Sequence, residues 1–330
     1  MADALVSPAV AVTMYAATGA AAAYSIKKLE DEDIPKKVAK MGVMGSFVFA
    51  AQMINFTIPG TGSSGHLCGG MLLAAVLGPY AGFLTMIGVL LTQALLFGDG
   101  GLLALGANVW NMAFYGCFVG YLIIWKPMMS HGMSRKKIVT ASVLGAILTL
   151  QLGALSVTLE TLASNVTELP FGVFLAAMQP IHLAIGAVEG LITAAVLSYI
   201  YSARPEMLSM EAVQPAIKKV RLSESFVTAV LTIAAFVIGG IGAHFASGNP
   251  DGLEWSMEKV AGTSELSASG MIHSAAEKIQ EFFAVLPDYA FANSDSPLGT
   301  TVSGIVGILI ILALAAAISF AAKKLSANKK

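Results

Sequence analysis

Long apolar runs separated by short polar connections dominate this chain. A run of about 17–25 apolar residues is long enough to cross a bilayer as a helix. The pattern predicts apolar segments at residues 8–26, 41–58, 67–77, 80–97, 102–125, 138–159, 174–201, 226–245 and 301–322. The third of these spans only about 16 Å at 1.5 Å per residue, roughly half a membrane. We therefore predict an all-α polytopic membrane protein with nine crossings, in which a half-length helix completes the third.

A polar patch, Ile58-Pro-Gly-Thr-Gly-Ser-Ser-Gly-His66-Leu-Cys-Gly-Gly70, joins the second segment to the short third one. A loop followed by a half-length helix is expected to dip into the membrane. Irregular backbone at that depth persists only where protein or a wet cavity surrounds it. His66 is the strong ligand in this loop, and an imidazole at membrane depth indicates a binding site.

The composition agrees with a membrane location. The chain is 56% hydrophobic and 12% charged, with a mean hydropathy of +0.76, whereas about a quarter of the residues are charged in ordinary soluble domains. All Lys and Arg residues except Lys259 and Lys278 fall within residues 27–40, 126–137, 204–221 and 323–330. The positive-inside rule places these clusters in the cytoplasm. It predicts a multi-pass protein of the cell membrane with its N-terminus outside and its C-terminus in the cytoplasm.

The connections divide the chain into two units. Residues 1–201 hold seven apolar segments, and residues 202–224 form a cytoplasmic linker. Residues 225–330 hold two helices around an external loop at residues 246–298. That loop is acidic and contains one amphipathic stretch, residues 269–286.

Two pairs of amide side chains lie in apolar segments at helical spacing. Gln52 and Asn55 are three residues apart, and so are Asn108 and Asn111. Residues three apart share one face of a helix. Such amides either form helix–helix hydrogen bonds, worth about 0.6 kcal/mol per contact, or orient a ligand-bearing loop from behind.

His182 and Glu189 lie seven residues apart, two turns along one face of the segment at residues 174–201. An intramembrane carboxylate is unfavourable unless it is paired or hydrated, so the two residues predict either a structural ion pair or a functional polar path. The second interpretation fits a proton-coupled secondary transporter, although the two halves of the chain show no inverted repeat. His131, His244 and His273 fall at or near the predicted surfaces, where a histidine is usually solvated.

A rhomboid-type intramembrane serine protease is an alternative from a different class. Gly62-Ser-Ser-Gly65 contains its Gly-x-Ser-Gly pattern, and a Ser64–His182 dyad would need a hydrogen bond and an oxyanion hole. The glycine spacing after His182 differs by one from the rhomboid pattern, and short Gly/Ser patterns recur by chance. No Walker A or nucleotide fingerprint occurs in the sequence. We therefore expect no enzyme activity in this chain and any ATP hydrolysis on a separate subunit.

Residues 42–56, Gly-Val-Met-Gly-Ser-Phe-Val-Phe-Ala-Ala-Gln-Met-Ile-Asn-Phe, followed by the loop of His66, resemble the CbiM/NikM family. The resemblance continues through Leu-Leu-Phe-Gly-Asp-Gly-Gly at residues 95–101, Ala-Leu-Gly-Ala-Asn at 104–108 and the helix of His182 and Glu189, and covers about residues 1–200. The second unit resembles the CbiN/NikN-type partner, whose PDGLE motif matches Pro-Asp-Gly-Leu-Glu at 250–254. The chain thus looks like a fusion of the two.

This resemblance implies a function. Members of the family are substrate-specific components of energy-coupling-factor transporters for cobalt and nickel, which act with an ATPase and a transmembrane scaffold subunit. The chain would then bind Co²⁺ or Ni²⁺ as its transported substrate and hold no resident cofactor. Both ions accept nitrogen ligands, so the sequence leaves the choice between them open.

The resemblance also implies a metal site. Family members insert their N-terminus and bind the ion through the terminal amine, a backbone nitrogen and the imidazole of a histidine at position two. A loop histidine that corresponds to His66 completes the set, and nitrogen donors in a square plane suit nickel or cobalt. Here the chain begins Met1-Ala2-Asp3; either a Met-His precedes Met1 in the protein, or Met1 and Asp3 supply donors. The implied ligands are Met1 and His66. The supporting residues are Gln52, Asn55, Ser64, Asn108, Asn111, His182 and Glu189.

The acidic external loop at residues 246–298 suggests a separate role for the second unit. Excess Asp and Glu near a mouth raise the local concentration of divalent cations. Oxygen donors, however, are poorly suited to selecting cobalt or nickel over calcium and magnesium. We therefore expect residues 225–330 to aid metal access or release and to leave the ligands to the first unit.

Overall fold

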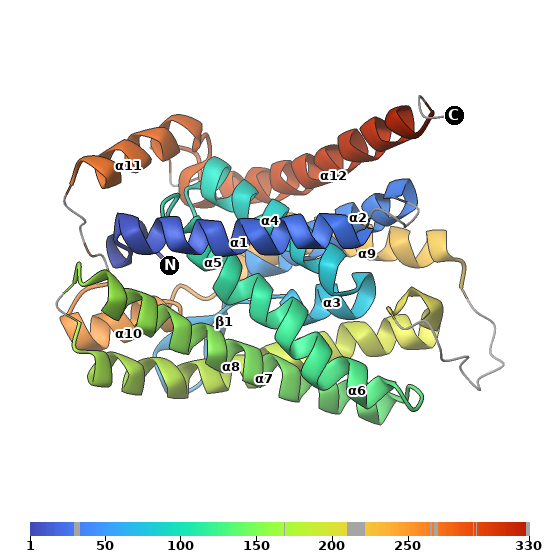
Figure 1. Cartoon of the computed structure of the whole chain (residues 1–330), viewed down its shortest axis with the longest axis horizontal. Coiled ribbons are helices and arrows are strands. Elements are labelled where there is room, and N and C mark those ends of the chain that lie inside the picture. Colours follow the sequence, from blue (N-terminus) through green and yellow to red (C-terminus); the bar gives the residue numbers. More distant parts are fainter. Residues whose placement is uncertain are drawn as a thin grey trace.

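The computed structural model describes residues 1–29, 34–167, 169–209, 222–264, 266, 270–292, 294 and 296–327. Its long helices run side by side along the longest axis of the molecule (Figure 1). Within these ranges, six helices are long and apolar enough to cross a membrane. They are α1 (Pro8–Leu29), the helix Pro79–Phe97, the helix Leu105–Met129, α7 (Arg135–Ser164), α8 (Phe171–Ala203) and the Leu298–Phe320 part of α12 (Leu298–Ala327). The predicted all-α polytopic fold is confirmed.

Two further helices follow the same axis. α2 (Ile34–Gln52) carries Lys36, Lys37 and Lys40 in its first turns, whereas the rest of the helix is mostly apolar. α9 (Glu224–Gly240) is apolar but has only 17 residues. Its N-terminus is capped by Ser223, whose hydroxyl accepts a hydrogen bond from the backbone N–H of Phe226.

Two membrane helices change from α-helical to π-helical winding along their length. α4 (Pro79–Thr92) continues as the π-helix η2 (Gln93–Phe97). α5 (Leu105–Val109) continues as the π-helix η3 (Trp110–Trp125) and then as α6 (Lys126–Met129). π-helical turns are rare and often lie at functional sites. η2 ends at Gly98, whose φ of 67° lies in the left-handed region that favours glycine.

The segment predicted at residues 41–58 is not one helix, and this is the main correction to the sequence-based prediction. α2 ends at Gln52, and β1 (Phe56–Ile58) pairs antiparallel with β2 (Ser63–Gly65). The stretch after α2 is rich in aromatic and β-branched residues and runs into Pro59, which favours extended backbone before it. The polar stretch between α2 and α3 is therefore a short β-hairpin.

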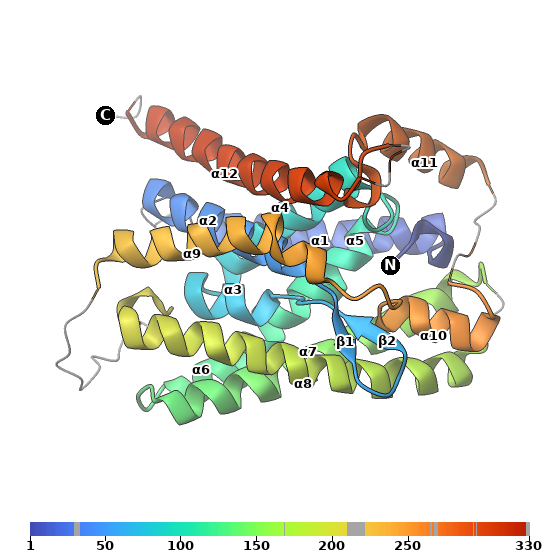
Figure 2. The ribbon, with the colours of Figure 1, turned by 180° about the vertical axis from the view of Figure 1, so that it is seen from behind.

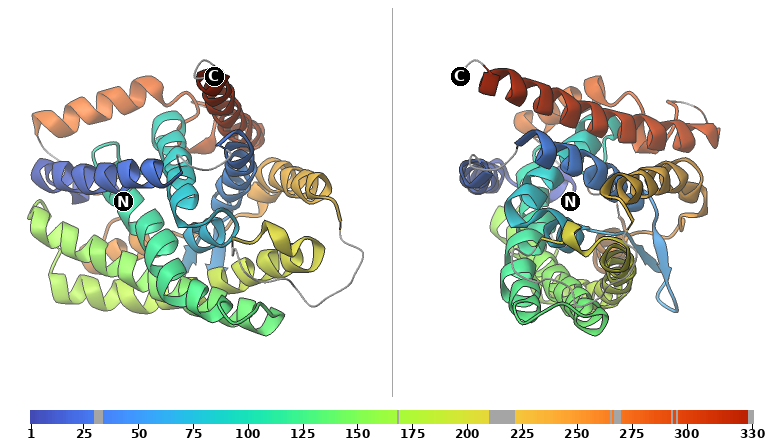
Figure 3. Two further views of the ribbon diagram at one scale, coloured as in Figure 1. Left: turned by 45° about the vertical axis from the view of Figure 1, so that its right-hand side comes forward. Right: turned by 90° about the vertical axis from the view of Figure 1, so that its right-hand side faces the viewer.

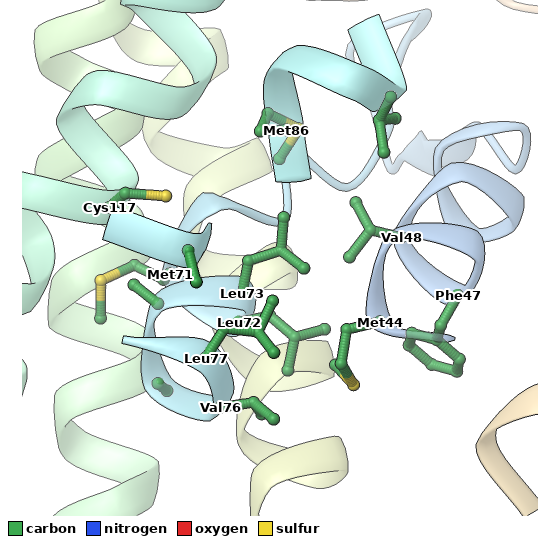
Figure 4. Close-up of a cluster of buried hydrophobic side chains, with 14 of the residues drawn as sticks. Met44, Phe47, Val48, Met71, Leu72, Leu73, Val76, Leu77, Met86 and Cys117 are labelled. Carbon is green, nitrogen blue, oxygen red and sulfur yellow. The ribbon is translucent and has the colours of Figure 1, made fainter. Parts of the chain in front are cut away.

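The half-length helix predicted at residues 67–77 is present as α3 (Gly70–Leu77). All eight of its residues are buried. Figure 4 shows its side chains packed between α2, α4 and η3, against residues such as Val48, Met86 and Cys117. The helix backbone also touches η3, because a Cβ on Gly70 would lie 2.8 Å from the carbonyl oxygen of Met112. Protein rather than lipid surrounds this short helix.

The C-terminal unit packs on α2. α9 and α12 lie against α2 and each other, on the opposite side of the bundle from α7 and α8 (Figure 3). Small residues permit this close approach. A Cβ on Gly304 would collide with the backbone of Gly239, and one on Gly307 would enter the ring of Phe49.

The loop at residues 246–298, predicted to be external, is folded onto the rest of the molecule. η5 (Gly242–Phe245) precedes it, and the loop itself contains α10 (Gly252–Ala261), α11 (Met271–Phe283) and η6 (Pro287–Tyr289). α11 matches the predicted amphipathic stretch, part of which (residue 269) lies outside the described residues. α10 sits beside β2 and α8, as Figure 2 shows from behind.

The ends of the helices segregate by charge. α6, the C-terminal end of α8 and the C-terminal end of α12 lie at one end of the bundle, whereas the N-terminal segment, α10 and α11 lie at the other (Figure 1). The first end carries the basic clusters that begin α2 and α7. Most of the predicted cytoplasmic linker, residues 210–221, lies outside the described residues.

Candidate metal site

A cavity of about 750 Å³ lies at the end of the bundle that holds the N-terminal segment. Several parts of the chain line it: residues 1–4, the end of α2 with the loop before α3, Leu90 and Gln93 of the helix Pro79–Phe97, the turn at residues 98–101 with α5 and Met112, and residues between 251 and 289. Among the predicted site residues, the lining includes Met1, Gln52, Asn55, His66 and Asn108. Ser64, Asn111, His182 and Glu189 lie behind the lining rather than in it.

His66 stands between β2 and α3 and is half-buried. Its Nδ1 lies 3.3 Å from the carbonyl oxygen of Leu67. The described part of the chain offers Nε2 no hydrogen-bond partner, so that nitrogen is free to bind a ligand. The preceding glycine keeps the loop close to α8, because a Cβ on Gly65 would lie 2.7 Å from the side chain of Ile185.

Glu189 and Gln52 hold the chain that follows His66. The two carboxylate oxygens of Glu189 accept hydrogen bonds from the backbone N–H groups of Cys68 at 2.9 Å and Gly69 at 3.0 Å. The Gln52 side-chain amide donates to the carbonyl oxygen of Cys68 at 3.0 Å. The free N–H groups and positive dipole at the start of α3 favour a carboxylate there. Glu189, only 1% exposed, thus ties the His66 loop and α3 to α8.

The N-terminal segment inserts into the molecule. Leu5 and Val6 are fully buried. The carbonyl oxygen of Met1 accepts hydrogen bonds from the Asn108 side chain and from the backbone N–H of Gly101, both at 3.1 Å. The Asp3 carboxylate accepts a hydrogen bond from the N–H of Ala104 at 2.8 Å, just before α5. These contacts bring Met1 into the same cavity as His66.

The other predicted polar residues bond elsewhere. Asn111 donates to the Glu160 carboxylate at 2.7 Å. The hydroxyl of Ser64 donates to the carbonyl oxygen of Asn249 at 2.8 Å, whereas His182 Nδ1 donates to that of Met178 at 2.8 Å. Within the described residues no hydrogen bond joins Ser64 to His182, so the geometry does not form the protease dyad.

The glycines beyond His182 have a packing role. A Cβ on Gly186 would lie 2.9 Å from the backbone of Ile147, and one on Gly190 would lie 2.5 Å from the backbone of Val143. These glycines allow α7 and α8 to approach closely. Their spacing therefore has a structural explanation that requires no catalytic base.

The Pro-Asp-Gly-Leu-Glu motif forms the start of α10. Asp251 is the N-cap and accepts hydrogen bonds from the N–H groups of Leu253 and Glu254, while the Glu254 carboxylate accepts one from the N–H of Asp251. This reciprocal capping box closes the first turn of the helix. Gly252 is needed because a Cβ there would lie 3.0 Å from the His182 ring. Sequence reasoning missed α10, although the Asp-x-x-Glu spacing signals such a start.

Backbone contacts join this motif to the hairpin before His66. The N–H of Ser64 donates to the carbonyl oxygen of Pro250 at 2.8 Å, and the indole N–H of Trp255 donates to that of Thr61 at 3.0 Å. The N–H of Ser247 donates to the carbonyl oxygen of Asn55 at 2.7 Å. The C-terminal unit therefore covers the hairpin directly.

The cavity is acidic. Its lining includes Asp3, Asp99, Asp251, Glu254, Glu277 and Asp288. Burial and, next, the charge of Asp251 raise the pKa of the Glu254 carboxyl above its ordinary value. Neither Lys nor Arg belongs to the lining in the part of the chain that the structure describes. The resulting negative potential attracts cations.

α11 and η6 close one side of the cavity. Tyr289 donates a short hydrogen bond to the Asp99 carboxylate, and its ring stacks on Phe97 with 4.7 Å between centroids. Burial, followed by the charge of Asp99, raises the pKa of the Tyr289 hydroxyl well above its usual range. Gln280 of α11 donates to the carbonyl oxygens of Ala94 and Gly100.

His273 corrects the prediction that it is a solvated surface histidine. It is only 8% exposed, and its Nε2–H donates to the carbonyl oxygen of Val6 at 3.0 Å. Its position on α11 gave no sign of this burial, because the partner belongs to the N-terminal segment. His273 thus holds the N-terminal segment against α11.

The described residues contain no group of three or more His, Cys, Asp or Glu side chains that could hold a metal ion. A site built on His66 would need donors of another kind, such as the amine and backbone nitrogens of the inserted N-terminal segment. Nitrogen donors match the preferences of late first-row transition metals.

The fold and the cavity together define a multi-pass membrane protein with a cation-attracting site near one end of its bundle. Comparison with known families makes this specific. Residues 1–207 match the family described as "Cobalt uptake substrate-specific transmembrane region", and residues 225–324 match the PDGLE domain. The chain belongs to this family, CbiM, and carries the PDGLE domain in the same polypeptide.

Individual relatives agree. A putative fused nickel transport protein NikMN of Archaeoglobus fulgidus is 34% identical over 318 residues, covering 96% of this chain and 97% of that protein. The fused nickel transport protein NikMN of Rhodobacter capsulatus is 28% identical over 337 residues, covering 94% of each. A crystal structure of a transition metal transporter is 33% identical with a TM-score of 0.54, and the match covers 61% of this chain and 92% of that one.

Proposed function

We propose that this protein is the substrate-specific membrane component of an ATP-driven energy-coupling-factor importer for Co²⁺ or Ni²⁺. The proposal rests on membership of the CbiM family and on relatives named as nickel or cobalt transport proteins. ATP hydrolysis would belong to a separate ATPase subunit, which acts through a transmembrane scaffold. Neither a Walker A loop nor a nucleotide fingerprint occurs in this sequence.

The observation that carries the site assignment is the meeting of the N-terminal segment and His66 in one acidic cavity. We assign Met1 and His66 as metal ligands, with the free Nε2 of His66 as one nitrogen donor. Gln52 and Glu189 hold the His66 loop, while Asn108 holds Met1. This division follows the usual pattern in which outer hydrogen bonds orient the ligands.

The C-terminal unit supports the site rather than supplying its selective ligands. Its carboxylates at Asp251 and Glu254 face the cavity, where they would concentrate divalent cations. Oxygen donors do not select cobalt or nickel from calcium and magnesium. The α10 and α11 end of the bundle would face outward, and the basic end would face the cytoplasm, in keeping with the positive-inside rule.

Metal binding by the purified full-length chain tests the proposal. The His66→Ala variant should lose high-affinity Co²⁺ and Ni²⁺ binding measured by calorimetry, and it should also lose the thermal stabilisation that these ions give the wild type. His131→Ala is the matched control, because His131 is an exposed histidine in the turn that follows α6, and α6 lies at the opposite end of the bundle. Equal affinities in wild type and His66→Ala would refute the site. ATP-independent uptake after reconstitution would refute the coupling.

A further inference from the structure

Glu160 is a buried carboxylate that the proposed ligand set does not use. It lies in α7, within the membrane-spanning part of the chain, and is 8% exposed. One oxygen, Oε2, accepts a hydrogen bond from Asn111 Nδ2 at 2.7 Å. The other oxygen, Oε1, and the side-chain oxygen of Asn111 are buried without a hydrogen-bond partner among the described residues.

An ionised carboxylate in such a place requires a positive charge nearby, because the group otherwise takes up a proton. An uncompensated charge in a membrane segment is strongly unfavourable, and buried acids there usually mark an ion path or a partner. No described Lys or Arg forms an ion pair with Glu160; the ion pairs that the structure shows involve Glu224 and Glu206. For Glu160 to be ionised, its counter-charge must therefore come from a group other than a described Lys or Arg.

Packing places Glu160 beside the N-terminal segment. Ala154 and Val157 of α7 form one apolar cluster with Leu5 and Val6, and Met1 packs against the same cluster. Glu160 follows Val157 by one helical turn and so continues that face of α7. α7 also contacts the N-terminal helical turn Asp3–Leu5 directly.

Asn108 and Asn111 link the carboxylate to the cavity. They are three residues apart where α5 passes into η3, so they project from neighbouring positions. Asn108 donates to the carbonyl oxygen of Met1, and Asn111 donates to Glu160. Asn108 and Asn111 thus hold the Glu160 carboxylate in a fixed position relative to the N-terminal segment, which reaches the cavity.

We propose that Glu160 is a positioning residue for the metal site, the counter-charge that holds the N-terminal segment and the divalent cation bound beside it. This inference rests on the proposed function. Amine and imidazole donors are neutral when they bind a metal, so they leave its double positive charge intact. A fixed carboxylate just behind the ligands offsets part of that charge without occupying a coordination position.

The Glu160→Gln variant tests this inference, because it keeps the size of the side chain and an acceptor for Asn111 but removes the charge. Changes of this kind behind a metal site usually weaken binding about 10- to 100-fold. We expect that loss for both Co²⁺ and Ni²⁺, with the visible absorption spectrum of bound Co²⁺ unchanged because the ligands are unchanged. Glu160→Asp should recover part of the affinity, and exposed Glu258→Gln serves as the control.

Three results would overturn the inference. Wild-type affinity in Glu160→Gln would show that the charge is not needed, and an altered Co²⁺ spectrum would show direct ligation instead. If Glu160→Gln fails to fold, Asn111→Leu takes its place, since it frees the carboxylate from its clamp; unchanged affinity there would also refute the role. Failure of the proposed function is separate, because His66→Ala would then bind metal as well as the wild type does.

Discussion

The hydrogen bonds between Glu189 and the backbone at the start of α3 allow the effect of a Glu189 substitution to be estimated. Glu189→Gln preserves the volume of a side chain that is 1% exposed. The amide oxygen of the glutamine still accepts a hydrogen bond from one of the two N–H groups, that of Cys68 or that of Gly69. The amide NH₂ group faces the other N–H, and two donors cannot form a hydrogen bond. The variant therefore loses one hydrogen bond to a charged group, about 1.5–3 kcal/mol. That loss corresponds to about a 10- to 150-fold change in an equilibrium constant.

We expect most of this change to appear in metal affinity. The apolar residues of α3 still pack in the bundle, whereas the loop that carries His66 loses its anchor and must be ordered when the metal binds. Calorimetry with Co²⁺ and Ni²⁺ on the purified variant measures the effect, beside exposed Glu258→Gln as the control. Gel filtration and metal-free thermal unfolding establish that the variant is folded. A folded Glu189→Gln protein that binds within about twofold of the wild type would refute the anchoring role, because the smallest loss estimated above is about tenfold.

Three further predictions concern the N-terminus, the motif at α10 and the orientation. Ala2 lines the cavity, so Ala2→His should add a nitrogen ligand and tighten Ni²⁺ binding about tenfold or more, by about 1.4 kcal/mol; Ala9→His should not, and equal behaviour of the two would contradict the site. Asp251→Ala should destabilise α10 by about 1 kcal/mol, seen as faster hydrogen exchange at residues 252–261, whereas Asp251→Asn should retain the cap; equal exchange in both would exclude the capping explanation. In a background lacking Cys68 and Cys117, an impermeant thiol reagent should label Ala261→Cys but not Ser130→Cys in intact cells, and the reverse labelling would invert the proposed orientation.

The sequence was sufficient for the membrane helices and for the short α3. Length and uniform apolarity identify a crossing because the bilayer sets both requirements. The same rule explains the error at residues 41–58: apolar content persists past Gln52 although the backbone has changed to a strand. Hydropathy reports the environment of a residue, and it does not distinguish a helix from a hairpin when protein encloses both.

The site was only partly predictable for a related reason. His66, Gln52 and Asn108 stand out because polar residues are rare in apolar runs. Glu160 does not, since its significance depends on Asn111, 49 positions away. The burial of His273 likewise depends on Val6, 267 positions away in the chain. Contacts of this kind arise from tertiary packing, which a single sequence read segment by segment does not reveal.

The burial of α3 has a consequence for leakage. Beyond the His66 loop, an ion would meet the seven buried apolar side chains of α3, Met71–Leu77. A bare divalent ion entering such a region would face a very large dehydration barrier. The resting protein should therefore be closed by α3. We expect it to conduct neither protons nor metal ions under an applied voltage. Glu189 and Gln52 join the chain after His66 to the start of α3. Any motion that displaces α3 should therefore also move His66.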